Sequence, residues 1–349
     1  MKTPLDINRN SDSMINPAGL HGSNSIPTWQ QELARGFSSL IDLFSFLELD
    51  ISEFPINAEA AREFPFKVTR SFASRIKKGD INDPLLKQVL PILAESVNPV
   101  DFVNNPVGDL EAIAVPGVLH KYAGRALLIV TGGCAINCRY CFRRNFPYTD
   151  TQLSKQKRAA ALEYIRNRID IKEVILSGGD PLIQSNQQLG DLIKEIEGVS
   201  HVHRLRIHSR LPNVLPSRID SGFLKILSHS RLKSVVVVHI NHPNELDQQV
   251  KGAVSRLRRA NISVFNQAVL LRGVNDNVKT LTALCETLFD AGILPYYLHL
   301  LDKAKGSHHF NVSVAECKKL QDTLRSTLPG YLIPKFVTEQ AGKANKIPL

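Results

Sequence analysis

The chain has 349 residues, of which 43% are hydrophobic and 22% charged, and its formal net charge is +10 at pH 7. This composition excludes a fibrous or wholly disordered protein and is typical of a globular protein with one or two cores. No apolar run approaches the roughly 18 residues that span a bilayer, and the polar residues 1–25 lack the apolar core of a signal peptide. We therefore expect a flexible N-terminus over residues 1–25 and a cytoplasmic protein whose thiols stay reduced.

The positive charge is not concentrated in one segment. Basic residues are scattered among acidic ones, and RLRR at residues 256–259 is the densest basic cluster. Proteins that bind nucleic acid usually carry a basic face or stripe. The charge pattern therefore predicts no nucleic-acid partner, and the lack of a spanning segment predicts no membrane partner.

Residues 26–120 are predicted to form a helical N-terminal region. The segments PTWQQELARGFSSLIDLFSFLEL and DPLLKQVLPIL repeat apolar residues at helical spacing. This spacing indicates helices that pack against the rest of the protein, and it says nothing about chemistry.

Strand-like and helical patterns alternate over residues 121–330. Six β-rich segments begin near residues 126, 173, 204, 234, 263 and 296: ALLIV, EVILS, RLRIHS, SVVVVHI, SVFNQAVLL and PYYLHLL. The later starts are roughly 30 residues apart, the length of one strand–helix unit. Residues 331–349 add the strand-like YLIPKFVTE and a tail. The pattern predicts an α/β fold with a partial parallel (β/α)6-type TIM-like barrel, and a flat doubly wound sheet is the alternative.

Polar and reactive residues gather after the predicted strands. Parallel barrels build their active sites at the carboxyl ends of the strands, so one mouth could collect all of these side chains. They are Cys134, Cys138, Cys141, Ser177, Gly178, Gly179, Asp180, His208, Arg210, His239, Gln267, His299 and Asp302.

The stretch GGCAINCRYCFRR at residues 132–144 holds three of the five cysteines. Zinc sites usually take four protein ligands in paired short spacings, and no second CxxC follows. Cys285 and Cys317 stand in helical patterns and are expected to be small buried side chains. Three thiolates could instead hold a four-iron cluster that leaves one iron open to another ligand.

The spacing CxxxCxxC followed by Phe142 resembles the signature of radical S-adenosylmethionine enzymes. The resemblance implies a 4Fe-4S cluster on Cys134, Cys138 and Cys141, with S-adenosyl-L-methionine on the open iron. One electron from a donor then cleaves the sulfonium and gives a 5'-deoxyadenosyl radical. The family also has a glycine-rich turn after the second strand that receives the methionine amino group, and SGGD stands there at residues 177–180.

Further motifs resemble the lysine 2,3-aminomutase family over nearly all of residues 95–349. They are GRALLIVTGGC, CRYCFRRNFPY, ILSGGDPL, RLRIHSRLP, HINHPNE, NQAVLLRGVNDN and LPYYLHLLDKAKGSHHF. The front end, VTRSFASRIKKGDINDPLLKQVLP, resembles the short bacterial members that work with elongation factor P. This implies conversion of (S)-α-lysine to (R)-β-lysine, which a partner ligase attaches to that factor. The oligomeric state stays open, with a homo-oligomer among the alternatives.

The aminomutase resemblance also implies pyridoxal 5'-phosphate and a lysine that binds it covalently, because the migrating nitrogen passes through an imine. The family places this lysine just ahead of a Thr-Pro pair, and the chain ends EQAGKANKIPL. Matching Lys-x-Pro selects Lys346, with Lys343 as the alternative. Ile347 stands where the family has threonine, and the turn is poorer in glycine than usual.

The same resemblance assigns the remaining roles. It predicts that Tyr122 and Arg125 hold pyridoxal phosphate, and that Arg143 pairs with the substrate carboxylate, for which a guanidinium offers two parallel hydrogen bonds. The distal ammonium of lysine is assigned to Asp302 and Glu339. Ser177, Gly178, Gly179, Asp180, His239 and Gln267 are predicted to hold S-adenosylmethionine.

Three alternatives remain beside the lysine enzyme. One is an aminomutase acting on glutamate or another amino acid, which would not need two acids for a distal ammonium. Another is a metal-stabilised RNA-binding protein, suggested by the net charge and the cysteines. The third is a noncatalytic protein that binds elongation factor P directly.

Overall fold

A computed structural model of the chain describes residues 28–349. The predicted flexible N-terminus, residues 1–25, lies outside the described residues. Within residues 28–349, no helix is both long enough and apolar enough to cross a membrane.

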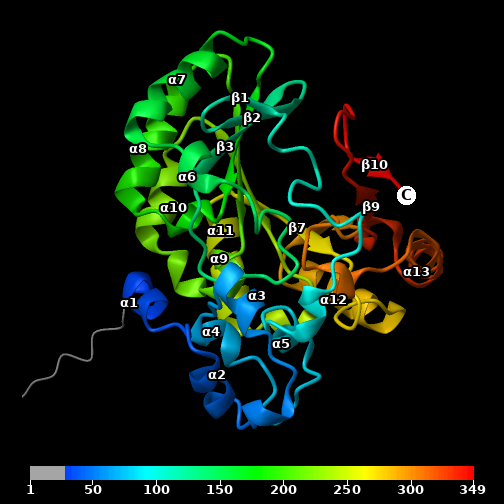
Figure 1. The fold of residues 1–349 in the computed structure, drawn as a ribbon. Helices are drawn as coiled ribbons and strands as arrows, with labels where there is room; N and C mark the ends of the chain where they lie inside the picture. The colour runs from blue at the N-terminus through cyan, green and yellow to red at the C-terminus, as the bar shows by residue number, and fades with distance from the viewer. Residues whose placement is uncertain (1–27) are drawn as a thin grey trace, which may run out of the picture.

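Ten strands form one sheet whose spatial order follows the chain order (Figure 1). The strands are β1 (Ile113–Val115), β2 (Val118–Tyr122), β3 (Arg125–Thr131), β4 (Glu173–Gly178), β5 (Arg204–Ser209), β6 (Lys233–Val238), β7 (Ser263–Val269), β8 (Leu294–His299), β9 (Lys335–Thr338) and β10 (Ile347–Pro348). β3 to β9 pair in parallel, whereas β1, β2 and β10 add antiparallel edges. A doubly wound sheet would need a reversal of strand order. The prediction of a partial parallel barrel is therefore confirmed.

Helices cover the outside of the barrel and connect successive parallel strands (Figure 1). They are α6 (Tyr148–Thr151), α7 (Lys155–Arg166), α8 (Asn186–Glu197), α9 (Leu211–Val214), α10 (Ser221–Ser228), α11 (Gln248–Arg259), α12 (Val278–Asp290) and α13 (Val314–Thr327). α8 shows why they form. The Ser185 hydroxyl caps its first turn, and Leu189, Leu192, Ile193 and Ile196 are buried along one face. A helix with a capped first turn and one apolar stripe is stabilised when that stripe packs against an apolar surface, here that of the barrel.

The N-terminal helices lie at one end of the barrel (Figure 1). They are α1 (Trp29–Ala34), α2 (Leu40–Phe46), α3 (Ala58–Glu63), α4 (Arg70–Ala73) and α5 (Pro84–Lys87). The backbone N–H groups of Asn137 and Arg139 donate to the carbonyls of Lys67 and Gln88, at 3.0 and 2.8 Å. The N-terminal region therefore supports the cysteine loop that follows β3.

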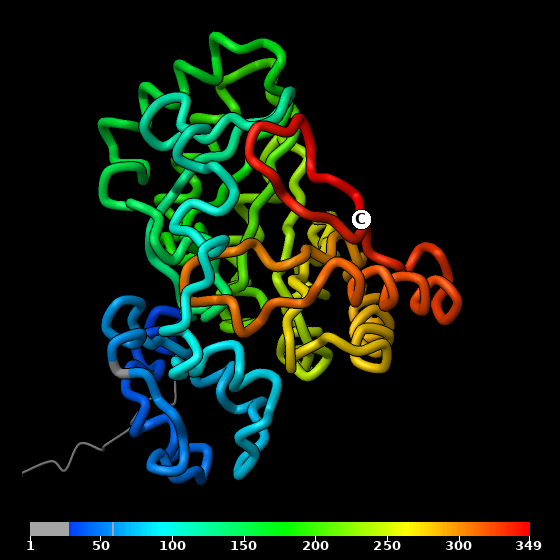
Figure 2. Tube along the Cα trace, turned by 45° about the vertical axis from the view of Figure 1, so that its right-hand side comes forward, coloured from blue at the N-terminus to red at the C-terminus, as the bar shows by residue number. Residues whose placement is uncertain are grey.

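The C-terminal segment returns across the open side of the barrel, beside the chain that precedes β1 (Figure 2). β10 pairs with β9, and the N–H of Leu349 donates to the Phe336 carbonyl at 3.1 Å. Lys121 at the end of β2 forms an ion pair of 2.9 Å with Glu339. These contacts hold the tail where Lys346 can reach the barrel interior.

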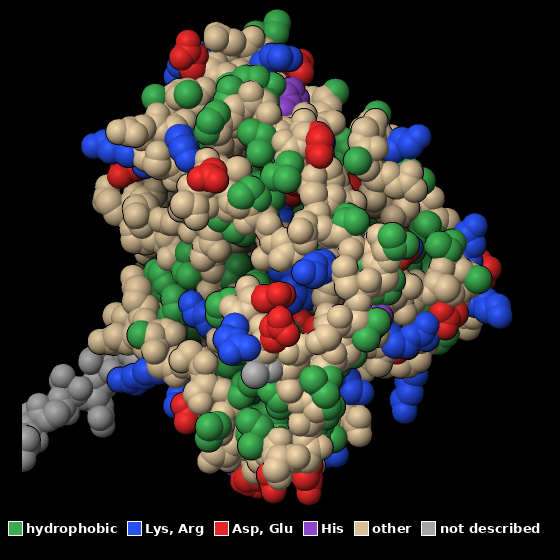
Figure 3. All heavy atoms as spheres, in the orientation of Figure 1, with side chains coloured by type: hydrophobic (Ala, Val, Ile, Leu, Met, Phe, Trp, Pro, Cys, Tyr) green, Lys and Arg blue, Asp and Glu red, His purple; other side chains and the backbone are tan. Residues whose placement is uncertain are grey.

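Charged side chains of both signs share the outer surface. On the face shown in Figure 3, Lys and Arg side chains are interspersed with Asp and Glu side chains. The basic groups that matter for the site lie instead in the barrel interior, as described next.

Candidate active site

A cavity of about 450 Å³ occupies the interior of the barrel. Side chains alternate in direction along a strand, and on β4 and β5 every second residue faces this space. The sequence-predicted residues that line it are Tyr122, Arg125, Arg143, Ser177, His239, Gln267, Asp302, Glu339 and Lys346. Residues from β2 to the tail before β10 thus share one space, although more than two hundred positions separate the first from the last.

The amino-terminal end of the cavity is rich in arginine. Arg125 is the first residue of β3, and its guanidinium lies 4.5 Å from the centroid of the Tyr122 ring. Arg206 of β5 pairs with Glu173, the first residue of β4, at 2.7 Å, and Arg204 also lines the cavity. Three guanidinium groups near one carboxylate suit the binding of an anionic group such as a phosphate.

Arg143 is held in place by ion pairs on the other side of the cavity. Its Nε lies 2.6 Å from Asp109 Oδ2, and its Nη1 donates to Ser177 Oγ at 3.3 Å. Lys121 pairs with the second oxygen of Asp109 at 2.5 Å and with Glu339 at 2.9 Å. A chain of alternating charges therefore runs from the cysteine loop to the C-terminal tail.

Lys346 points into the cavity and forms an ion pair with Glu339. Burial alone would raise the pKa of Glu339, but Lys346 and Lys121 outweigh it and lower that pKa to about 2. Burial and the nearby Glu339 raise the pKa of Asp302 to about 7. Lys343, in contrast, is exposed and does not line the cavity.

Three histidines that line the cavity offer free ring nitrogens. Burial lowers the pKa of His239 to about 4, and for the same reason the pKa values of His208 and His299 lie well below the ordinary value. The three imidazoles are therefore neutral at pH 7. Within the described part of the chain, the Nε2 atom of each lacks a hydrogen-bond partner. Buried polar atoms of this kind are available to a ligand.

The three clustered cysteines lie in the loop after β3 and are all free. Burial, the carboxylate of Asp180 and the other two thiols raise the pKa of Cys134, and burial with the neighbouring Cys138 raises the pKa of Cys141 to about 11. In residues 28–349, no three His, Cys, Asp or Glu side chains are arranged to hold a single metal ion. Each thiolate of an iron–sulfur cluster binds a different iron, so three cysteines on one loop suit the ligands of such a cluster.

The glycine turn after β4 packs directly on the start of the cysteine loop. Gly178 has a φ of +116°, and a Cβ on Gly179 would lie 2.3 Å from the Gly133 carbonyl oxygen. The N–H groups of Gly179 and Asp180 donate to the carbonyls of Thr131 and Gly133 at 2.7 and 2.8 Å. Both glycines are therefore required by the backbone, whatever ligand the turn receives.

Asp180, like Gly178 and Gly179, does not line this cavity, whereas Ser177 does. Its carboxylate is buried and accepts from the N–H groups of Leu182, Arg210 and Leu211 and from the Ser209 hydroxyl. Through these four hydrogen bonds the Asp180 carboxylate joins the glycine turn to the end of β5.

We expect Gly179→Ala to destabilise the protein by about 1–3 kcal/mol, the usual cost of forcing a methyl group into a packed site. The added Cβ would meet backbone atoms of Gly132 and Gly133, which cannot rotate away. Chemical denaturation measures the free energy of unfolding. The control is Gly190→Ala in α8, where the new Cβ would meet only the Ile226 side chain at 3.6 Å. Equal stability of the two variants would contradict the packing account.

Sequence reasoning gave no role to several charged residues of the cavity, among them Asp109, Glu173, Arg204 and Arg206. Arg206 stands two positions before His208 on β5, and Glu173 stands four positions before Ser177 on β4, so the alternation of these strands carried a signal. Asp109 follows no predicted strand, and its contact with Arg143 spans 34 residues. No local pattern could have revealed it.

The buried Cys285 and Cys317 agree with the sequence prediction and are 2% and 1% exposed. They lie in α12 and α13 and face the core. The chemistry of the cysteines is therefore confined to the loop after β3.

Comparison with known proteins agrees with this geometry. The radical SAM superfamily model matches residues 128–284. An L-lysine 2,3-aminomutase of Escherichia coli strain K12 is 44% identical over 322 residues, covering 92% of this chain and 94% of the relative. The Haemophilus influenzae protein of the same name is 45% identical over 91% of this chain and 94% of its own length. That of Clostridium subterminale is 32% identical over 92% of this chain and 77% of its own length. The chain therefore belongs to the L-lysine 2,3-aminomutase family of the radical SAM superfamily.

Proposed function

We propose that the chain is an isomerase that converts (S)-α-lysine to β-lysine by moving the amino group from C2 to C3. The observation that carries the proposal is the lining of one cavity by Arg143, Lys346 and the acid pair Asp302 and Glu339. A guanidinium matches the carboxylate of lysine and the acids match its distal ammonium. Lys346 would bind pyridoxal phosphate covalently between these two ends.

The described residues fit three cofactors. Cys134, Cys138 and Cys141 would hold a 4Fe-4S cluster. Ser177, Gly178, Gly179, His239 and Gln267 would bind S-adenosylmethionine, and Tyr122, Arg125 and Lys346 would bind pyridoxal phosphate. When bound, the cluster and S-adenosylmethionine supply a hydrogen-abstracting radical, and pyridoxal phosphate supplies an imine that accommodates an unpaired electron. The free Nε2 atoms in the cavity and its arginine-rich end support these assignments.

The protein contributes positioning and charge. Asp109 and Ser177 hold two nitrogens of the Arg143 guanidinium, which fixes its plane for a bidentate contact with a carboxylate. Glu339 holds the Lys346 ammonium in the free protein, so a substrate ammonium would compete for the same carboxylate. The tail lines one side of the cavity with Glu339 and Lys346 and would limit the entry of water during the reaction.

Lysine is favoured over glutamate because of the acids in the cavity. A glutamate side chain would bring a second carboxylate towards Asp302 and Glu339, and like charges in a buried site are unfavourable. Anaerobic incubation of the reconstituted protein with each amino acid tests this. We expect a β-amino acid from lysine and none from glutamate; the opposite preference would contradict the proposal.

Asp302→Asn is expected to raise the KM for lysine by roughly 10- to 100-fold, the factor that corresponds to about 1.5–3 kcal/mol for a lost charged hydrogen bond. Because the pKa of Asp302 is raised to about 7, the carboxylate forms only as the pH rises through 7. In the unaltered protein kcat/KM should therefore increase between about pH 6 and 8. The groups that bias this titration are Glu339, Lys346, Lys121 and Asp109.

The matched control for this prediction is Asp101→Asn. Asp101 is an exposed acid that pairs with Lys303, the residue after Asp302. We expect the control to keep both the KM and the rise with pH. Persistence of the pH-dependent rise in Asp302→Asn would show that another group controls it.

We further propose that the product is (R)-β-lysine and that it serves the modification of elongation factor P by a partner ligase. The support is the resemblance of the front end to the short bacterial members and the nearly full-length match to the Escherichia coli relative. Chiral chromatography of the product tests the stereochemistry. Mass spectrometry of elongation factor P from cells with and without this chain tests the link.

The proposed reaction also implies an electron-donating partner and a cellular location. The reaction needs a one-electron donor as a partner, because the cluster must be reduced before it can act. We also propose a cytoplasmic location, which the five free cysteines support.

A further inference from the structure

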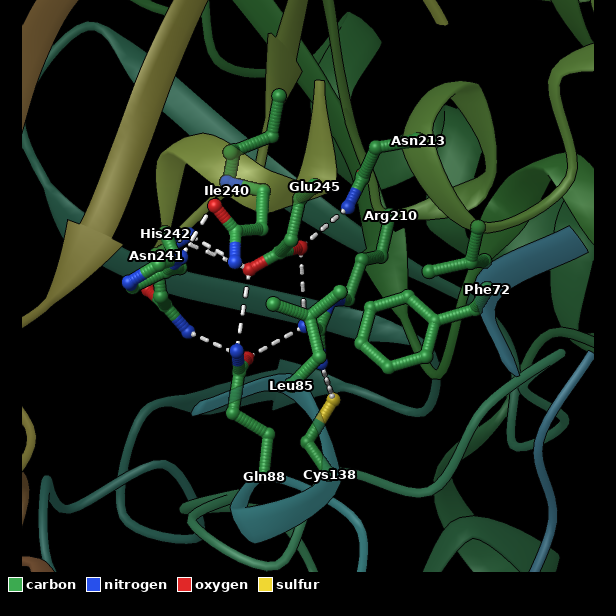
Figure 4. Close-up of polar contacts among 12 residues, drawn as sticks. Phe72, Leu85, Gln88, Cys138, Arg210, Asn213, Ile240, Asn241, His242 and Glu245 are labelled. Carbon is green, nitrogen blue, oxygen red and sulfur yellow. Dashed lines mark hydrogen bonds and ion pairs between the residues drawn. The ribbon is translucent and has the colours of Figure 1, made fainter. Parts of the chain in front are cut away.

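A buried polar network joins the cysteine loop to the carboxyl ends of β5 and β6 (Figure 4). Its centre is Arg210, which directly follows β5 and is 7% exposed. Arg210 donates from Nη1 to Cys138 Sγ at 2.6 Å, and from Nη2 to Gln88 Oε1 at 2.6 Å and Glu245 Oε2 at 3.2 Å. Cys138 thus has a charged hydrogen-bond donor.

Glu245 fixes the charge and the direction of Arg210. It is the last residue of the short 3-10 helix Pro243–Glu245 after β6, and it is 0% exposed. Its carboxylate is surrounded by donors: the side chains of Arg210, Gln88 and Asn213 and the N–H groups of Asn241 and His242. These donors satisfy both oxygens of the buried carboxylate, and the contact with Oε2 directs the Arg210 guanidinium (Figure 4).

Other contacts lock the rest of Arg210. Its backbone N–H donates to Asp180 Oδ2 at 2.7 Å. Its guanidinium carbon lies 5.3 Å from the centroid of the Phe72 ring and 5.7 Å from that of the Tyr140 ring. Because the side chain is ordered before any ligand binds, it can hold its hydrogen bond to sulfur without further loss of conformational entropy.

We propose that Arg210 is a positioning residue of the iron–sulfur site, which orients Cys138 and raises the reduction potential of the cluster through a charged N–H···S hydrogen bond. Glu245 opposes this effect, because its carboxylate lies 3.2 Å from the Arg210 guanidinium and offsets part of its positive charge. Hydrogen bonds to cluster sulfurs and nearby net charge are established determinants of cluster potential. The inference rests on the cluster that the radical SAM family implies and does not depend on lysine as substrate.

The test is the midpoint potential for one-electron reduction of the cluster in the full chain, reconstituted with iron and sulfide and titrated anaerobically with electron paramagnetic resonance detection. Arg210→Met should shift the potential to a more negative value, because a cation and a donor are lost. Glu245→Gln should shift it to a more positive value, because an anion is lost. A purely structural role would not move the two variants in opposite directions.

Arg75→Met is the matched control. Arg75 is buried, pairs with Asp247 and donates to the carbonyls of Asn213 and Glu245. Arg75 therefore stabilises the segments that contain Asn213 and Glu245 but does not contact Cys138. We expect a lower free energy of unfolding in this variant but a clearly smaller shift in potential than in Arg210→Met.

A double variant, Arg210→Met with Glu245→Gln, guards against misfolding, because the single change leaves a buried carboxylate without its cation. The double variant should keep a negative shift, smaller than that of Arg210→Met. Potentials equal to that of the unaltered protein in both Arg210 variants would overturn the proposal, as would weaker S-adenosylmethionine binding without a shift. Both Arg210 variants could instead lose iron. If their circular dichroism stays native and Arg75→Met keeps its iron, the loss supports a role of Arg210 in positioning Cys138. Equal iron loss in all three variants would refute the proposal.

Discussion

Lys346→Ala is expected to reduce the formation of β-lysine by roughly 10⁴-fold or more, as loss of a covalent catalytic group does in other enzymes. Lys346 lines the cavity and its ammonium lies against Glu339. The strand β10, which begins at the next residue, holds it there. Absorbance of bound pyridoxal phosphate and turnover of lysine are the measurements, and both should be lost together.

Lys343→Ala is the control for this prediction, because Lys343 is exposed and lies three residues earlier in the same tail. It should keep cofactor and activity. Borohydride reduction followed by peptide mapping gives an independent answer about which lysine carries the cofactor. Label on Lys343 would overturn the choice of Lys346.

Cys141→Ala is expected to abolish both cluster binding and turnover. With one thiolate gone, a second iron of the cluster would lose its protein ligand, and iron–sulfur clusters are held by their thiolates. The prediction covers Cys134 and Cys138 equally, because all three thiols lie in the loop that follows β3. Iron and sulfide content after anaerobic reconstitution, together with the broad visible absorption of the cluster, provide the readout.

Cys317→Ala is the matched control for the cysteine variants. Cys317 lies in α13, is 1% exposed and packs in the hydrophobic core. Its loss should cost some stability but leave the iron content unchanged. Full iron content in Cys141→Ala would be incompatible with a cluster on this loop.

The regular strands of the barrel were predictable because each is a run of β-branched and other apolar residues set between helical patterns. SVVVVHI, for example, contains most of β6 (Lys233–Val238), and its short length and four consecutive valines favour a strand over a helix. β1 and β2 were not anticipated. They are short, with three and five residues, although the Pro116-Gly117 pair between them is a turn signal that could have revealed the hairpin.

The candidate site was predictable where its residues stand in motifs or at strand ends, as with Arg143 and Asp302. Its ion pairs were not, because they depend on how distant segments meet. Lys121 and Glu339 are 218 positions apart and pair only because β2 and the tail lie at the same opening of the barrel. The same holds for Asp180, whose carboxylate oxygens accept from Ser209 and from the N–H of Arg210, donors that sequence spacing does not reveal.

The most direct test of the account is isotope tracing under anaerobic, reducing conditions with S-adenosylmethionine and pyridoxal phosphate. Lysine labelled only with ¹⁵N at the α-amino group is mixed with lysine labelled only with ¹³C throughout its carbon chain. We predict β-lysine in which the 3-amino nitrogen comes from the same molecule as the carbon chain. Formation of no β-lysine, or of β-lysine whose nitrogen has exchanged between molecules or with ammonia, would contradict a 2,3-amino migration inside this cavity.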